Sequence, residues 1–320
     1  MKRIEEFLEG VQTMGIAGHV RPDGDAVGSC MGLYLYIKKN YPQIRTDVYL
    51  DHPAPVFGHI SNIDDYRTRE KAGMIYDVFV TCDVSAPDRI SVGAGLFDTA
   101  VKTVCIDHHK SNPGFADINH VCPEVSSCSE VLYTLMDPEK VDRSTAEALY
   151  TGMIHDTGVF QYSSTTPRTL RIAAELIEKG IDFSKIIEES FYQKTYIQNQ
   201  VMGRVLAESI MLMDGKCIVG YIRKKDMAFY GITSNDLEGI VAQLRTTKGT
   251  EVAIFLYELE TQLFKVSLRS NGRVDVSKTA AWFGGGGHVR AAGCELSGSM
   301  YDVINNITEQ LENQVTELGL

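Results

Sequence analysis

The sequence predicts an α/β protein: an N-terminal domain with a parallel sheet and helices on both faces, followed by a smaller α/β domain with a mixed sheet. In the first half, short apolar runs alternate with helix-like segments, which is the pattern of doubly wound parallel sheets. In the second half, two pairs of apolar runs are each separated by turn residues, as in antiparallel hairpins. The composition agrees with a globular protein, because 44% of the 320 residues are hydrophobic and 23% are charged.

The predicted elements of the first half follow one another in the order expected of such a sheet. The apolar runs that we interpret as strands cover residues 15–20, 46–50, 76–83 and 101–107. The helix-like segments cover residues 25–39, 126–136, 144–155 and 167–179. The last helix is expected to stop before Gly180, because glycine commonly follows the C-terminus of a helix.

The character of the sequence changes after residue 180. A polar stretch continues into a helix that we expect to end near Glu208, and the two hairpins then turn at Asp214-Gly215 and near Glu260-Thr261. Further helices are expected over residues 234–244, 276–283 and 300–315. We therefore predict a first domain over residues 1–185, a linker or connecting helix over residues 186–200, and a second domain over residues 201–320.

Charge and composition exclude several classes of protein. The net charge is −11, and the acidic excess lies almost entirely in the first 190 residues, so the chain is not expected to coat long duplex nucleic acid. No apolar run approaches the ~18–20 residues of a membrane span, so we expect no membrane partner. The acidic start of the chain is unlike a secretory signal. Seven cysteines without a C-x-x-C pair indicate free thiols and a cytoplasmic location.

Four segments of the first half are expected to place acidic or histidine side chains at strand ends. Each segment alone also fits a plain turn or a helix cap. Together they are informative, because the carboxyl ends of parallel strands form one edge where ligands bind. The segments are His19-x-x-x-Asp23-x-Asp25, Cys82-Asp83, Asp107-His108-His109 and His155-Asp156.

These side chains suit two hard divalent cations. Carboxylate oxygens with a few imidazoles favour Mn²⁺ or Mg²⁺ over the thiolate sites that zinc prefers. Two cations close together need a bridging ligand, and such a pair drives attack on phosphorus. Asp23 and Asp25 lie two residues apart on a loop, so each can face a different cation.

Five motifs carry a family resemblance that spans nearly the whole chain. They are GHVRPDGDAVGS, VTCDVSAPD, IDHHKSN, GMIHDTGVF and FGGGGHVRAAG. In order and spacing they resemble the DHH phosphoesterase superfamily with its DHH-associated C-terminal domain. Within that superfamily they are most similar to the bacterial nanoRNase and pAp phosphatase branch, the NrnA-like proteins.

The resemblance implies the roles of the first-half residues and a cofactor of two Mn²⁺ ions, with Mg²⁺ as the alternative. One cation is expected on His19, Asp23 and Asp83, and the second on Asp25, Asp83, His108 and Asp156. Asp83 is then the bridging ligand, and His109 is the catalytic residue beside the phosphoryl oxygens. Asp107 is expected to orient an imidazole, with a plain cap at the end of the strand as the alternative. His155 stands where relatives often carry Thr, and its role stays open between an extra ligand, a proton relay and a structural part.

The second domain holds the candidate substrate residues. Residues 265–290 contain five cations against one acid, Asp275, and end in a glycine run before His288. Consecutive glycines let backbone N–H groups approach an anion closely. The resemblance assigns the nucleotide end of the substrate to Arg269, Ser270, Gly286, Gly287 and His288. Trp282 and Phe283 can stack on a base or pack into the core, and we favour the core.

The predicted function follows from these two sets of residues. We expect a metal-dependent phosphodiesterase that degrades short oligoribonucleotides and linear dinucleotides such as pApA and pGpG to 5′-mononucleotides. It is also expected to remove the 3′-phosphate of pAp. A homodimer is one state that the sequence allows. The alternatives are an inorganic pyrophosphatase or polyphosphatase, a non-catalytic nucleotide-binding module, and a processive exonuclease acting on single-stranded DNA.

Overall fold

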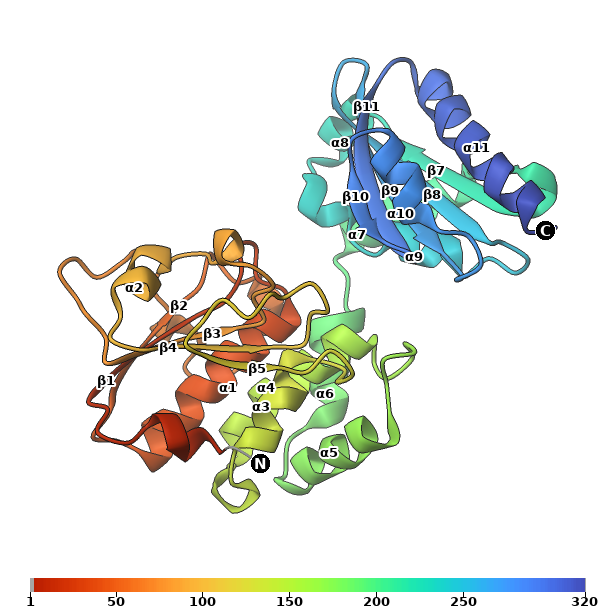
Figure 1. The fold of residues 1–320 in the computed structure, drawn as a ribbon. Helices are drawn as coiled ribbons and strands as arrows, with labels where there is room; N and C mark the ends of the chain where they lie inside the picture. The colour runs from red at the N-terminus through yellow and green to blue at the C-terminus, as the bar shows by residue number, and fades with distance from the viewer. Residues whose placement is uncertain (1–2, 320) are drawn as a thin grey trace. The chain divides into compact units, whose positions relative to one another are not determined.

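The computed structural model describes residues 3–319 and divides the chain into two compact units. The first unit ends at Gln193 and the second begins at Lys194 (Figure 1). Residues 186–200 hold the end of one helix, a π-helical turn and the start of the next helix, and the boundary between the units lies among them. Within the described residues, no helix is both long and apolar enough to cross a membrane.

The sheet of the first unit has five strands in the order β2-β1-β3-β4-β5, and all neighbouring pairs are parallel. This confirms the predicted parallel sheet. The bounds are β1 (Thr13–Ala17), β2 (Arg45–Tyr49), β3 (Val78–Cys82), β4 (Thr103–Asp107) and β5 (Ile118–Val121). The central strand β3 is buried over its whole length, which explains why its sequence is a continuous apolar run.

Helices cover both faces of this sheet, as the sequence predicts. Val78 and Val80 of β3 belong to one apolar core and Phe79 to another, because successive side chains of a strand point to opposite faces. The first core is formed with α1 (Gly24–Asn40), α3 (Cys128–Leu135), α4 (Arg143–Thr157), α5 (Pro167–Glu178) and α6 (Phe183–Ile187). The second core is formed with α2 (Ala94–Thr99). The unit ends with the π-helical turn η6 (Glu188–Tyr192).

The second unit has a mixed six-stranded sheet in the order β10-β11-β9-β8-β7-β6, which confirms the predicted class. Only β7 and β8 are parallel neighbours. The strands are β6 (Ile210–Leu212), β7 (Cys217–Ile222), β8 (Val252–Glu260), β9 (Leu263–Ser270), β10 (Gly286–His288) and β11 (Ala291–Ser297). The helices are α7 (Tyr196–Ala207), α8 (Lys224–Tyr230), α9 (Ile240–Arg245), α10 (Val276–Trp282) and α11 (Met300–Glu317).

The differences from the predicted elements have local causes. The helix expected over residues 234–244 is divided into a 3₁₀ turn (Ser234–Leu237) and α9. Gly239 lies between the two, and its φ of +87° is incompatible with a continuous helix. Strands β5 and β11 are not predicted from the sequence, since INHV and AAGCELS are not continuous apolar runs. The short helices α2 and α8 are not predicted either, because they have too few turns to show a periodic pattern.

Candidate metal centre

The predicted ligands meet at the carboxyl edge of the parallel sheet. His19 follows β1, Asp83 follows β3 directly, and His108 follows β4. These three strands are neighbours and run in the same direction, so their ends lie side by side. Asp23 and Asp25 come from the start of α1, and Asp156 comes from the last turn of α4.

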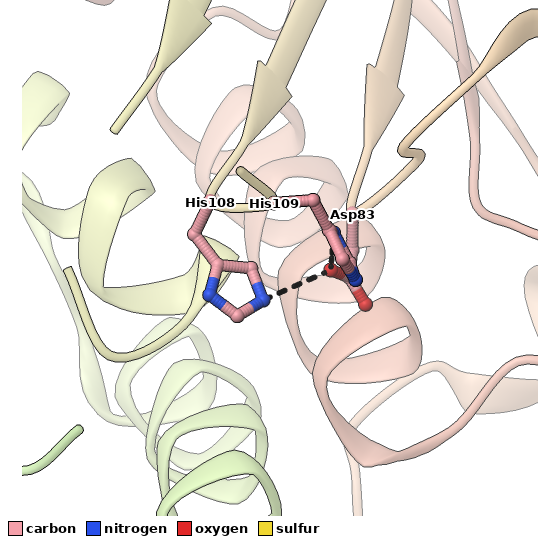
Figure 2. Close-up of side chains that lie close together, drawn as sticks. All are labelled: Asp83, His108 and His109. Carbon is pink, nitrogen blue, oxygen red and sulfur yellow. Dashed lines mark ion pairs between the residues drawn. The ribbon is translucent and has the colours of Figure 1, made fainter. Parts of the chain in front are cut away.

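Three overlapping groups of side chains lie close enough to hold a cation. In each group the ligand atoms lie within 4.8 Å of one another. Asp83 is shared by two of the groups, and His108 is also shared by two, as Figure 2 shows in part. The groups are His19 with Asp23 and Asp83; Asp25 with His108 and Asp156; and Asp83 with His108 and His109.

Asp83 is at the centre of this arrangement. Nε2 of His19 lies 3.5 Å from Oδ2 of Asp83, and Nε2 of His108 lies 3.5 Å from its Oδ1. Nδ1 of His109 lies 3.6 Å from the same Oδ1. The side chain is 3% exposed, and within the described residues Oδ1 has no hydrogen-bond partner. Asp83 also adopts a left-handed φ of +59°, a conformation that costs free energy in a non-glycine residue and is often found at functional sites.

Asp83 does not cap a helix, because the 3₁₀ turn after it starts at Pro87 with Ala86 as its cap. Burial raises the pKa of its carboxyl, but the neighbouring imidazoles of His108 and His19 hold that pKa well below the usual range. A buried carboxylate that stays ionised and has an unpartnered oxygen is a fitting ligand for a cation.

The histidines present their Nε2 atoms to the carboxylates. Nδ1 of His19 lies 2.8 Å from the carbonyl oxygen of Val20, which can only accept, so Nδ1 carries a proton. Nε2 then faces Asp23 Oδ1 at 3.7 Å as well as Asp83. Nε2 of His108 lies 3.1 Å from Asp156 Oδ2 and 4.0 Å from Asp25 Oδ2. A ring held through its other nitrogen, as that of His19 is, is usual for histidines that bind metals.

The pKa values of two acids and two histidines in this crowded cluster are raised. Burial, followed by the charge of Asp83, raises the pKa of Asp25 to about 7. Burial, followed by the charge of Asp25, raises that of Asp156 to about 9. Burial lowers the pKa of His19 and His108, but the neighbouring carboxylates raise it to about 10 in both. Without a cation the site therefore takes up protons, and a divalent cation can replace them. The oxygen-rich donor set fits Mg²⁺ or Mn²⁺.

Backbone N–H groups hold two of the carboxylates in place. Asp25 accepts from the N–H groups of Cys128 at 2.6 Å and Ser129 at 3.0 Å, at the start of α3. Asp23 caps α1 by accepting from the N–H groups of Asp25 and Ala26 at 3.0 and 3.1 Å. Both side chains are thus oriented before any cation binds.

A second hydrogen-bond chain orients His109. Its Nδ1 donates to Asp107 Oδ1 at 2.8 Å, as expected for Asp107, and this contact raises the pKa of His109. The other oxygen of Asp107 accepts from Asn112 Nδ2 at 2.6 Å, and Asn112 Nδ2 also donates to Val84 O at 3.0 Å. Asn112 is not predicted as a site residue from the sequence. Its only signal was its place in the IDHHKSN motif.

The predicted substrate residues of the second unit lie on neighbouring strands. Arg269 of β9 and His288 of β10 both pair with Ala291 of β11, so they lie in one row on the same face of the sheet. Gly286 lies two residues from His288, on that face. Gly287 and Ser270 alternate to the other face, where Ser270 is buried and its hydroxyl accepts from Gly272 N–H at 2.9 Å.

One expectation for this region is wrong. Trp282 is 72% exposed and does not pack in the core, whereas Phe283 packs against the core of the second unit. Two cations of residues 265–290 pair with acids from outside that segment. Lys265 pairs with Glu295 at 3.1 Å, because the two residues face each other on β9 and β11, and Arg273 pairs with Glu251 at 3.5 Å.

Comparisons with known proteins cover both units. The family model described as "DHH family, N-terminal domain" matches residues 13–153, and the one described as "DHHA1 domain" matches residues 214–317. A bifunctional oligoribonuclease and PAP phosphatase NrnA from Thermus thermophilus is 30% identical, covering 100% of this chain and 95% of that protein. Its namesake from Bacillus subtilis is 27% identical, with 93% of each covered.

Among solved structures, an exopolyphosphatase-related protein from Bacteroides fragilis is similar with a TM-score of 0.90 and 28% identity. The similarity covers 99% of this chain and 96% of that chain.

Proposed function

The chain belongs to the DHH family of phosphoesterases with a C-terminal DHHA1 domain, and from this premise we propose that it hydrolyses short oligoribonucleotides to 5′-mononucleotides. We include linear dinucleotides and the 3′-phosphate of pAp among its substrates. The observation that carries the proposal is similarity over the full length of both domains to a relative named for these two activities.

The proposed cation ligands are those expected from the sequence. His19, Asp23 and Asp83 would hold one Mn²⁺ or Mg²⁺, and the other would be held by Asp25, Asp83, His108 and Asp156; the geometric groups support this division. When bound, a pair of such cations supplies a water that ionises near neutral pH and stabilises charge on the phosphoryl oxygens.

His109 acts on the phosphoryl group in this proposal. Asp107 holds the proton of Nδ1, so Nε2 is the atom left for a substrate oxygen. Because the carboxylate raises the pKa of His109, the ring carries a second proton more readily and can donate it to that oxygen.

The two domains have separate tasks in this proposal. Residues 1–185 form the catalytic domain, and residues 201–320 bind the nucleotide end through the row that contains Arg269 and His288. All seven cysteines are unpaired, which supports a cytoplasmic enzyme.

A substrate panel at fixed Mn²⁺ concentration tests the proposal. The panel holds pApA, an RNA of a few nucleotides, a much longer RNA, pAp, pyrophosphate and a short polyphosphate. Rapid hydrolysis of the short RNAs, with some hydrolysis of pAp, is expected. Polyphosphate is included because of the description of the Bacteroides fragilis neighbour.

Each alternative gives a different result in the same panel. Turnover of pyrophosphate or polyphosphate alone would replace the nuclease by an inorganic phosphatase. Preference for long single-stranded DNA, in an added lane, would indicate a processive exonuclease. Nucleotide binding without turnover under any divalent cation would indicate a binding module.

A further inference from the structure

His155 occupies an aromatic cage beside the proposed ligands. It is the residue before Asp156 in the last turn of α4. Its ring meets Phe57 edge-on with centroids 5.2 Å apart, and Phe191 edge-on at 5.4 Å. These rings come from three separate segments of the first unit, so the position of the imidazole is fixed from two sides.

The same imidazole lies directly on the backbone of Gly24. A Cβ atom at Gly24 would come within 2.2 Å of His155 Cγ, which no side chain tolerates. Gly24 is the residue between Asp23 and Asp25, and their carboxylates face different cation groups. The ring of His155 therefore supports the loop that carries two of the proposed ligands.

A hydrogen bond joins His155 to the π-helical turn. Ser190 Oγ donates its single proton to Ile186 O at 2.7 Å, so at 3.2 Å it can only accept from Nε2 of His155. Ser190 is buried, and Phe191 is its neighbour in the same turn. The turn thus contributes both a ring contact and a hydrogen-bond acceptor to His155.

The π-helical turn is the last element of the first unit. Gln193, the final residue of that unit, donates its N–H to Glu188 O at 2.8 Å, which is the i to i−5 bond of a π-helix. Such turns are rare and often occur at functional positions. Here the turn connects the segment leading to the second unit with the ligand loop through one side chain.

We propose that His155 is a positioning residue that couples η6 to the Asp23–Asp25 loop. Cation binding then orders η6, and an ordered η6 strengthens cation binding, because such coupling is reciprocal. The inference rests on the proposed cation binding and does not depend on which phosphate ester is the substrate.

The experiment compares Mn²⁺ affinity and amide hydrogen exchange in the full chain. In the wild-type protein, Mn²⁺ is expected to slow exchange of the amides of residues 186–193. His155→Ala should weaken Mn²⁺ binding ~10-fold, as is typical when a residue that orients a metal ligand is lost, and should remove the slowing. Ser190→Ala should remove most of the slowing with a smaller loss of affinity, and it serves as the test if His155→Ala does not fold.

Two further variants separate the contacts. His155→Phe keeps a ring over Gly24 but cannot donate to Ser190, so it should retain more affinity than His155→Ala. His59→Phe is the matched control, since His59 is another partly buried histidine that bonds to a hydroxyl, Thr151 Oγ1 at 2.9 Å. It should change neither readout.

Three results would overturn the coupling: unchanged Mn²⁺ affinity in His155→Ala, slowing of exchange that survives in both Ser190→Ala and His155→Ala, or a wild-type protein that binds no Mn²⁺. Failure of the proposed function is distinct from these. It would appear as normal Mn²⁺ binding and normal slowing of exchange with no hydrolysis of RNA or pAp.

Discussion

The two units place their candidate functional groups in opposite environments. In the first unit, Asp25 and Asp83 are buried, and burial and neighbouring charges move their pKa values far from the ordinary range. In the second unit, the strand with Gly286 and His288 is exposed along its whole length. Groups that take part in catalysis need a fixed, desolvated environment, whereas groups that recognise a ligand can be exposed to solvent before it binds.

The sheets explain this difference. Neighbouring strands of the first unit are parallel, so their carboxyl ends bring His19, Asp83 and His108 together at one buried edge. In the second unit, antiparallel pairing arranges Arg269 and His288 as a row across a sheet face. If the comparison holds, substitutions in the first unit should affect cations and kcat, and those in the second should affect substrate binding.

The largest effect is expected for Asp83→Asn. Loss of the shared carboxylate removes a ligand from two of the three groups, so kcat should fall on the order of 10³-fold or more. Cation content, measured by elemental analysis, should fall with it, while thermal unfolding checks the fold. Turnover within ~10-fold of wild type would refute the assignment of Asp83 as the bridging ligand.

A smaller loss is expected for His109→Ala. If His109 donates to a phosphoryl oxygen, kcat should fall ~10²-fold while Mn²⁺ affinity stays within a few-fold. Single-turnover hydrolysis and calorimetry measure the two quantities. A large loss of affinity would instead make His109 a cation ligand, in the group it forms with Asp83 and His108.

His288→Ala tests the contribution of the second unit to substrate binding. KM for short RNA should rise ~10-fold with kcat and cation content nearly unchanged, because an exposed recognition contact contributes to substrate binding. The chain has one tryptophan, the exposed Trp282, whose fluorescence can report nucleotide binding near the glycine run. Loss of bound cation in this variant would contradict the division of tasks.

The smallest effect concerns pH and the cation-free protein. The pKa values of Asp25 and Asp156 are raised from 3.8 to about 7 and about 9, so their protonated forms stabilise the fold, and this stability is lost as pH rises. His19 and His108, raised from 6.5 to about 10, act in the same direction. Asp83, whose pKa is lowered, acts oppositely, but only in the acidic range.

The melting temperature of the cation-free protein should therefore fall by several degrees between about pH 6 and pH 10. Saturating Mn²⁺ should reduce this decline, since a cation replaces the protons. Thermal unfolding with a chelator and with Mn²⁺ measures both curves. A cation-free protein that becomes more stable over this range would show that the carboxylates do not share protons in the way described.

The family and the general architecture could be predicted from sequence, because the signals for them lie in short continuous segments of the chain. The family resemblance predicted from five short motifs is confirmed over both domains. Asp83 and His108 follow continuous apolar strands, so their meeting at one edge follows from strand direction alone. The assignment of individual cation ligands stays a prediction.

Other features depend on tertiary contacts that no local pattern contains. Asn112 supports Asp107 through a loop conformation, and Ser190 reaches His155 through a π-helical turn that has no sequence signature. Trp282 is exposed, whereas its neighbour Phe283 packs against the core of the second unit. The roles and the exposure of these residues depend on contacts between segments that are far apart in the sequence.

The order of the ligands along the chain has a consequence for synthesis on the ribosome. The ligand side chains run from His19 to Asp156, and they come from the loops after three strands and from two helices. A nascent chain that has not yet released α4 lacks Asp156 and cannot complete the cluster. Non-local sites of this kind form late in folding. Capture of a divalent cation by the whole cluster would therefore require that the chain has been made through the end of α4 and that β1, β3 and β4 already lie side by side.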